Sequence, residues 1–431
     1  MSMKSSKTTK YRKRIADELL KLKLSAMGAV LVEGAKWCGK TTTCEQQAKS
    51  VLCMVDPDRR KEYLALAEMD IGRLLQGERP RLIDEWQDAP QFWDAIRFRV
   101  DHEEGDGQFI LTGSAVPPNA DKISHSGTGR FARLKMRPMS LWESEESSGD
   151  VSLSSLFSGI EFACGVSSGI TLDEMAFIIC RGGWPQSIGR TGVRALVIAQ
   201  EYYEGVVESD ISRADNVSRN PDRVRRLLRS CARLQGTQAN VNAIYKDLKS
   251  NEMQEFDEDT ISSYVNALKK IFVIEDMAAW CPSLRAKGAI RTTDTRYFVD
   301  PSIAVAAMGI GPGNLVSDLR TFGFFFEALA VRDLRIYMDA LRGHVEKYHD
   351  KSGLECDAVL HTPDGKYALV EIKLGGETLI REGIASLEKL EMLIRGKGVP
   401  IPTFKMVLTA TGNYAYKDGD VIVCPISCLK L

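Results

Sequence analysis

The feature that most constrains this chain is a glycine-bounded segment, Gly34 to Thr41, which follows the apolar stretch Ala29 to Glu33. The apolar stretch predicts a buried strand, and the polar residues after the segment predict a helix. The segment fits GxxxxGK[ST] at every specified position. Its glycines let successive amide groups wrap phosphate oxygens at a helix N-terminus, so it predicts a site for ATP or ADP. The expected binding residues are Gly34, Ala35, Lys36, Trp37, Cys38, Gly39, Lys40, Thr41 and Thr42.

A second apolar stretch ends in two adjacent carboxylates, Asp84 and Glu85. We expect Lys40 to reach the β- and γ-phosphates, and Thr41 and Asp84 to hold Mg²⁺. Glu85 can polarise the water that attacks the γ-phosphate, which favours hydrolysis over nucleotide sensing. The alternatives are a glycine-rich loop without function and a surface pair of acids. Both alternatives are disfavoured because the two motifs occur together, each after a predicted strand.

The composition of the chain limits the class of protein it can be. Of the 431 residues, 44% are hydrophobic and 27% charged, with a net charge of -1, which is typical of a globular protein of two or three domains. No apolar run approaches the roughly 20 residues of a membrane-spanning helix, so we expect a cytoplasmic protein without a membrane partner. The ten cysteines include no CxxC pair, so we expect thiols and no zinc. We interpret His344 and His349 as surface or site-lining residues rather than ligands.

The pattern along the chain predicts an α/β protein with three regions. Residues 1–145 show short apolar strands separated by helices, as in a mostly parallel sheet. Two Ser- and Gly-rich stretches, 144–149 and 165–169, predict a boundary between them. Residues 170–315 are helical, and three helices followed by a β-ribbon is the order of a winged helix.

Residues 316–431 begin with an aromatic-rich helix and continue as a sheet. A turn at 363–365 joins two predicted strands in a hairpin. Two further apolar strands are expected on either side of the turn at 418–420. The four predicted strands are Leu354 to Leu360, Tyr367 to Lys373, Lys405 to Thr409 and Val421 to Val423.

The hairpin carries a set of charged residues. Glu371 and Lys373 share one strand face, and Asp357 lies on the preceding strand. With Glu327 from the upstream helix, the set resembles the PD-(D/E)XK nuclease superfamily. That resemblance implies that Asp357 and Glu371 bind Mg²⁺, that Lys373 positions water and that Glu327 completes the metal shell. The alternative is a structural hairpin with an exposed charged face, and Cys356 stands where the superfamily has Pro.

Arginines are dense between Arg213 and Arg233. With a winged helix behind them, they predict contact with DNA phosphates. The alternative is the solvated face of a helix, because Asp210, Asp215 and Asp222 lie among the arginines and can pair with them.

The sequence resembles the AAA-type P-loop ATPases of bacteria and archaea that carry a C-terminal helical and restriction-endonuclease-like region of unknown function. The resemblance implies that Ser114 is a sensor near the γ-phosphate. It implies that Arg130 is an arginine finger donated to a neighbouring subunit, with Arg133 as the alternative donor. Many relatives have Pro-Arg at Ala35-Lys36, which leaves the role of Lys36 open. Besides the phosphate loop, the resembling segments are Leu82 to Glu85, Leu111 to Ser114, Gly129-Arg130, Arg137 to Leu141, Gly182 to Pro185 and Tyr297 to Asp300.

Two functions follow for the whole chain. In the first, an AAA-type ATPase domain over 1–145 hydrolyses ATP with Mg²⁺ in a homo-oligomer. It acts on DNA through the winged-helix region and the nuclease-like domain at 316–431. In the alternative, ATP controls oligomeric state, and the C-terminal domain is a catalytically silent binding module.

Overall fold

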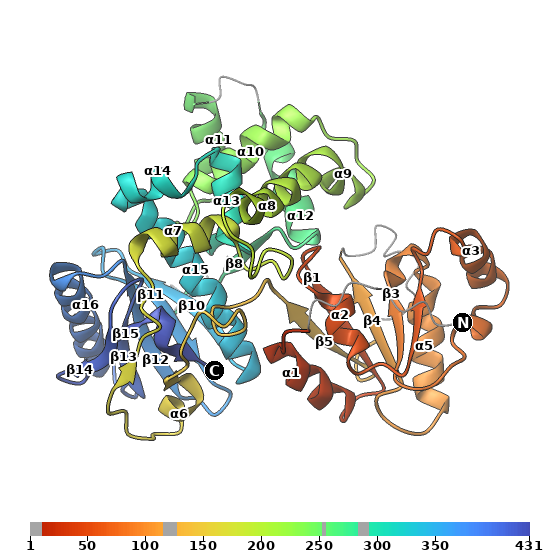
Figure 1. Ribbon diagram of the computed structural model, residues 1–431, viewed down its shortest axis with the longest axis horizontal. Helices are drawn as coiled ribbons and strands as arrows, with labels where there is room; N and C mark the ends of the chain where they lie inside the picture. Colours follow the sequence, from red (N-terminus) through yellow and green to blue (C-terminus); the bar gives the residue numbers. More distant parts are fainter. Residues whose placement is uncertain (1–10, 115–126, 252–255, 283–292) are drawn as a thin grey trace. The chain divides into compact units, whose positions relative to one another are not determined.

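The computed structural model describes residues 11–114, 127–251, 256–282 and 293–431 (Figure 1). The described residues divide into two compact units. The first unit comprises 11–33, 39–113 and 127–134, and the second comprises 34–38, 114 and the described residues from 135 onward. None of the helices in these ranges is both long and apolar enough to cross a membrane.

The first unit contains a five-stranded sheet in the order β2-β3-β4-β1-β5. Neighbouring strands among β2, β3, β4 and β1 run parallel, so their carboxyl ends meet at one edge. The buried core joins strand residues such as Leu31 and Leu111 to Phe92 and Trp93 of α5. The strands are β1 (Ala29–Gly34), β2 (Ser50–Cys53), β3 (Arg81–Asp84), β4 (Phe109–Gly113) and β5 (Phe131–Met136). The helices are α1 (Ile15–Leu24), α2 (Lys40–Glu45), α3 (Arg60–Met69), α4 (Ile71–Leu74), η1 (Trp86–Asp88) and α5 (Gln91–His102).

Helices form the middle of the second unit, and α10 shows why they form. Asn220 caps its first turn by accepting hydrogen bonds from the amides of Asp222 and Arg223, with Pro221 at the first helical position. The apolar face that spacing predicts is buried, and Leu227 and Leu228 are fully covered. The elements are α7 (Leu172–Arg181), α8 (Val193–Gly205), η3 (Val206–Asp210), α9 (Ile211–Arg213), α10 (Pro221–Arg233), α11 (Val241–Asn251), α12 (Glu258–Lys270), β8 (Ile274–Met277), β9 (Thr295–Phe298), α13 (Pro301–Met308) and α14 (Pro312–Ser317).

The second unit also contains a seven-stranded sheet, in the order β10-β11-β12-β13-β15-β14-β7. Strands β10, β11 and β12 are antiparallel, whereas β12, β13 and β15 are parallel. Both α15 and α16 pack against this sheet. Its elements are β7 (Gly165–Val166), α15 (Leu319–Ala340), β10 (His344–His349), β11 (Glu355–His361), β12 (Tyr367–Lys373), α16 (Glu377–Gly396), β13 (Phe404–Thr409), β14 (Tyr414–Asp418) and β15 (Val421–Pro425).

Two expectations about this sheet need correction. The turn at 418–420 joins β15 to β14, which the sequence did not reveal, because β14 is exposed and polar at most of its positions. The second Ser- and Gly-rich stretch, 165–169, begins with β7, which pairs with β14. The first stretch, 144–149, precedes β6 (Val151–Ser152) and α6 (Leu153–Phe157), and β6 pairs with β16 (Leu429–Lys430), which follows η5 (Ile426–Cys428).

A buried ion cluster joins distant segments of the second unit. Asp300 is fully buried and accepts hydrogen bonds from the Gly183 amide at 3.0 Å and the Arg332 guanidinium at 2.7 Å. Arg332 also bonds Asp333, whose other carboxylate oxygen accepts the Leu141 amide at 2.9 Å. Three segments of the family resemblance therefore meet at α15, and Trp184 between them is fully buried.

We predict that Asp300→Ala destabilises the second unit by about 3 to 5 kcal/mol, because it leaves Arg332 and the Gly183 amide buried without this partner. The matched control is Asp318→Ala, which removes an exposed helix cap that accepts from the Thr321 amide and should cost about 1 kcal/mol. Urea midpoints, with hydrogen exchange in α13 and α15 to identify the unit that opens, measure both. Equal losses in the two variants would contradict the prediction.

Candidate functional site

The phosphate loop requires glycine at both ends. Gly34 has φ 155°, and a Cβ there would lie 2.0 Å from the Met136 carbonyl oxygen. Gly39 has φ 99° and directly precedes α2, which begins at Lys40. Any other residue would clash with Met136 at position 34 and would be strained at position 39, so this loop conformation depends on both glycines. Figure 1 shows this loop between β1 and α2.

The predicted magnesium ligands are in direct contact. The Thr41 hydroxyl donates to Asp84 Oδ1 at 2.7 Å, and the Thr112 hydroxyl donates to the same oxygen at 2.5 Å. Asp84 and Lys40 are each only 6% exposed. Adjacent ligands of an octahedral Mg²⁺ lie roughly 2.9 Å apart, since each is about 2.0 to 2.1 Å from the ion. The Thr41 and Asp84 oxygens therefore fit Mg²⁺. The sequence analysis missed Thr112, which β4 places opposite Asp84 in the ladder.

Glu85 follows β3 in a left-handed conformation, with φ 55°. The side-chain amide of Gln87 donates to the Glu85 carboxylate, which restricts its orientation. A Cβ on Gly113 would lie 2.8 Å from Gln87 Oε1, so glycine at the end of β4 leaves room for this arrangement. Gln87 was not predicted, because its role depends on the turn after Asp84.

The other residues proposed for catalysis are also among the described residues. Ser114 follows β4 and is buried. Arg130 Nε lies 2.7 Å from Asp101, and Arg133 contacts both Glu33 oxygens at 3.1 Å. The Arg130 and Arg133 side chains are 44% and 62% exposed, so each arginine is in a surface ion pair of its own unit.

The structure gives Lys36 a partner, which the sequence left open. Within the second unit its Nζ lies 2.5 Å from Asp210 Oδ1, at the end of η3. The neighbouring Trp37 ring contacts Tyr202 edge to face at 5.7 Å. The η3 segment is a π-helix, a geometry that often occurs at functional sites.

The four residues of the nuclease-like set lie near one another, together with a lysine that the sequence analysis missed. Lys373 Nζ lies 2.6 Å from Glu371 and 3.6 Å from Asp357. Lys347, from β10, lies 2.7 Å from Glu327 and 3.8 Å from Asp357. Asp357 also accepts the Ile372 amide at 2.8 Å. The three carboxylates thus face two ammonium groups.

Burial and the neighbouring Asp357 raise the pKa of Glu371 to about 8. Burial also acts to raise the pKa of Asp357, but Lys373 and Lys347 outweigh it and lower that pKa. Asp357 is therefore the stronger acid of the pair. A divalent ion between Glu327 and Asp357 would compete with the Lys347 ammonium, so the fit of a metal to this cluster is poorer than at Thr41 and Asp84.

Several of the arginines predicted to contact DNA are engaged inside the second unit. Arg219 is buried and paired with Asp215, and Arg233 lies 2.6 Å from Asp247. Arg225 pairs with Glu204 and Glu208, two acids on other segments. These pairs agree with the alternative of a salt-bridged helix face, and DNA contact stays a prediction.

Comparison with known proteins identifies two regions. Residues 27–145 match the family model described as "AAA domain", and residues 172–314 match a "Domain of unknown function (DUF8612)". None of the curated proteins matches.

Among solved structures, the Walker-type ATPase PABY2304 of Pyrococcus abyssi is 14% identical, with a TM-score of 0.42; the match covers 69% of this chain and 96% of that one. The Signal Transduction ATPase with Numerous Domains (STAND) protein PH0952 from Pyrococcus horikoshii, which has a tetratricopeptide repeat sensor, is also 14% identical. Its TM-score is 0.22, and the match covers 75% of this chain and 52% of that one. On the family match and the loop geometry, the chain carries an AAA-type P-loop ATPase domain.

Proposed function

We propose that this chain binds ATP with Mg²⁺ and hydrolyses it at the loop that begins at Gly34. The observation that carries the proposal is the 2.7 Å contact between Thr41 and Asp84, beside the buried Lys40. A hydroxyl and a carboxylate at this separation can share one Mg²⁺ next to the phosphates.

Each residue then has a distinct task. Lys40 neutralises charge on the β- and γ-phosphates, and the amide groups between Gly34 and Gly39 bind phosphate oxygens. Mg²⁺, when bound, neutralises charge that develops on the phosphates. Glu85 accepts a proton from the attacking water, and Gln87 positions the Glu85 carboxylate. Ser114, at the end of β4, is proposed to contact the γ-phosphate.

We predict that Lys40→Ala lowers ATP affinity by at least about tenfold, whereas Glu85→Gln retains affinity and slows hydrolysis by about 100-fold or more. Lys40 acts on bound phosphate in every state, but Glu85 acts only on the water. Titration calorimetry and phosphate release measure the two effects. Lys61→Ala and Glu62→Gln, both exposed on α3, are the matched controls. Unchanged ATP affinity in Lys40→Ala would refute this assignment.

The arginine finger is proposed to come from another copy of the chain. Arg130 is exposed on the first unit, where its guanidinium pairs with Asp101 and donates to the Thr128 carbonyl, and such surface contacts cost little to break. A homo-oligomer would bring this guanidinium to a neighbour's γ-phosphate, with Arg133 as the alternative donor.

We therefore expect the specific rate of ATP hydrolysis to fall on dilution, and Arg130→Ala to be slow at every concentration. Arg133→Ala tests the alternative donor, and Arg73→Ala, which removes an exposed pair with Asp70, is the control. Light scattering at each dilution reports the subunit number. A constant specific rate together with an active Arg130→Ala would exclude this arginine as a finger donated between subunits.

For the second unit, one observation favours a catalytically silent binding module over a nuclease. Lys347 supplies a fixed ammonium between Glu327 and Asp357, where the nuclease proposal needs a divalent ion near Asp357. The nuclease proposal keeps its support from the convergence of Glu327, Asp357, Glu371 and Lys373.

We predict that wild-type protein with Mg²⁺ or Mn²⁺ leaves plasmid DNA intact. We also predict that Lys347→Met binds Mn²⁺ more tightly than wild type, because the substitution removes the ammonium group that competes with the ion. Calorimetry with Mn²⁺ and a plasmid assay measure both, and Lys351→Met, an exposed lysine of the turn before β11, is the control. Cleavage by wild type that Asp357→Ala and Lys373→Ala abolish, with ATP turnover intact, would establish the nuclease instead. Measuring ATP turnover with and without DNA then tests whether ATP hydrolysis is coupled to DNA binding.

A further inference from the structure

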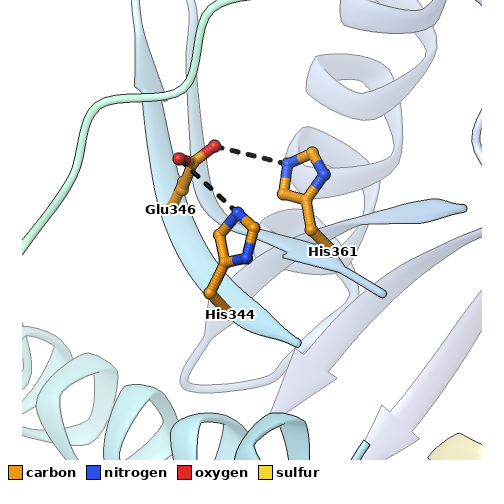
Figure 2. Close-up of side chains that lie close together, drawn as sticks. All are labelled: His344, Glu346 and His361. Carbon is orange, nitrogen blue, oxygen red and sulfur yellow. Dashed lines mark ion pairs between the residues drawn. The ribbon is translucent and has the colours of Figure 1, made fainter. Parts of the chain in front are cut away.

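A separate cluster of three potential metal ligands lies at the edge of the seven-stranded sheet. His344 and Glu346 are two residues apart on β10, the edge strand, so their side chains share one face. His361 ends β11 and is the direct antiparallel partner of His344. Figure 2 shows both imidazole rings directed towards the Glu346 carboxylate.

The distances suit a single ion. His344 Nε2 lies 3.7 Å from Glu346 Oε1, and His361 Nε2 lies 3.4 Å from Glu346 Oε2. One ligand atom from each residue lies within 4.8 Å of the others. In a tetrahedral zinc site with bonds of about 2.0 to 2.1 Å, neighbouring ligands are roughly 3.3 Å apart. Small rotations of these three side chains would bring their ligand atoms to the separations of a zinc site.

We propose that His344, Glu346 and His361 form a binding site for a divalent transition metal ion, with Zn²⁺ as the expected occupant. Two imidazoles and a carboxylate suit Zn²⁺ better than Mg²⁺ or Ca²⁺, which prefer oxygen ligands. Three protein ligands leave one tetrahedral position for water or another ligand.

Two further observations fit a ligand role for His361. Its Nε2 is buried, and no hydrogen-bond partner is found for it among the described residues. Its ring packs near Trp280 and Tyr367, with centroids 5.9 Å from each, which limits its orientations. A buried nitrogen that lacks a hydrogen bond is costly unless something else satisfies it, and a metal ion would do so.

The site is distinct from the carboxylate and lysine cluster. Glu346 and Lys347 are consecutive on β10, so their side chains leave opposite faces of the sheet. Lys347 contacts Glu327 of α15, whereas Glu346 faces the two histidines. Ligation at Glu346 would therefore leave the other cluster in place. It would also bind edge strand β10 more tightly to β11.

Zinc titration calorimetry on the full chain, prepared without a polyhistidine tag and treated with chelator, tests the proposal. We expect one zinc ion per chain at this site, and an affinity at least about tenfold lower in both His344→Ala and His361→Gln. His349→Ala is the matched control, because His349 lies on the same strand and faces a single carboxylate, Glu355. The control should bind zinc like wild type.

Cobalt substitution separates this site from the cysteines. Co²⁺ held by imidazole and carboxylate gives ligand-field bands without the thiolate charge-transfer band that a cysteine site produces. His344 is exposed, so His344→Ala should fold normally, and circular dichroism checks this. The proposal is overturned if zinc affinity is unchanged in His344→Ala, if His349→Ala loses as much, or if Co²⁺ shows thiolate charge transfer alone.

Discussion

The parallel register of β1, β4 and β3 is the constraint on which the nucleotide site depends. Asp84 stands opposite Thr112 in the ladder, and Val32 of β1 stands opposite Thr112 on the other side. This register brings the ends of the three strands to one edge, where the Thr41 and Thr112 hydroxyls reach the same Asp84 oxygen. A slip of one residue would turn Asp84 to the other face and separate these groups.

The second unit depends on a different kind of interaction, the burial of a charged network. Arg332 lies between Asp300 and Asp333, and these carboxylates also bind backbone amides of Gly183 and Leu141. Such a network contributes modest net stability, because desolvation offsets much of the attraction. Its larger effect is to fix how segments far apart in sequence come together.

The sequence predicted the features that are local. The loop from Gly34 to Thr41 and the strand ending at Asp84 each follow from residues close together in the chain. Thr112, Lys347 and His361 were missed, because their partners lie on other elements, such as the helix α15 that carries Glu327, and the sequence does not specify how these elements come together. The sequence suggested DNA contact for arginines such as Arg233, because their acidic partners lie on other helices and could not be recognised from the sequence.

The ladder between β10 and β11 changes register once. Two residues of β10, from Glu346 to Tyr348, advance against three of β11, from Cys356 to Val359. Asp357 lies within this β-bulge, and its carboxylate accepts the Ile372 amide of β12. The structure around the bulge therefore depends more on the number of residues in β11 than on which residues they are. Deleting one residue at the bulge would restore a regular ladder with the flanking pairs on their present faces, but it would change the backbone that places Asp357 beside the Ile372 amide, so deletions here should be less tolerated than substitutions at exposed positions.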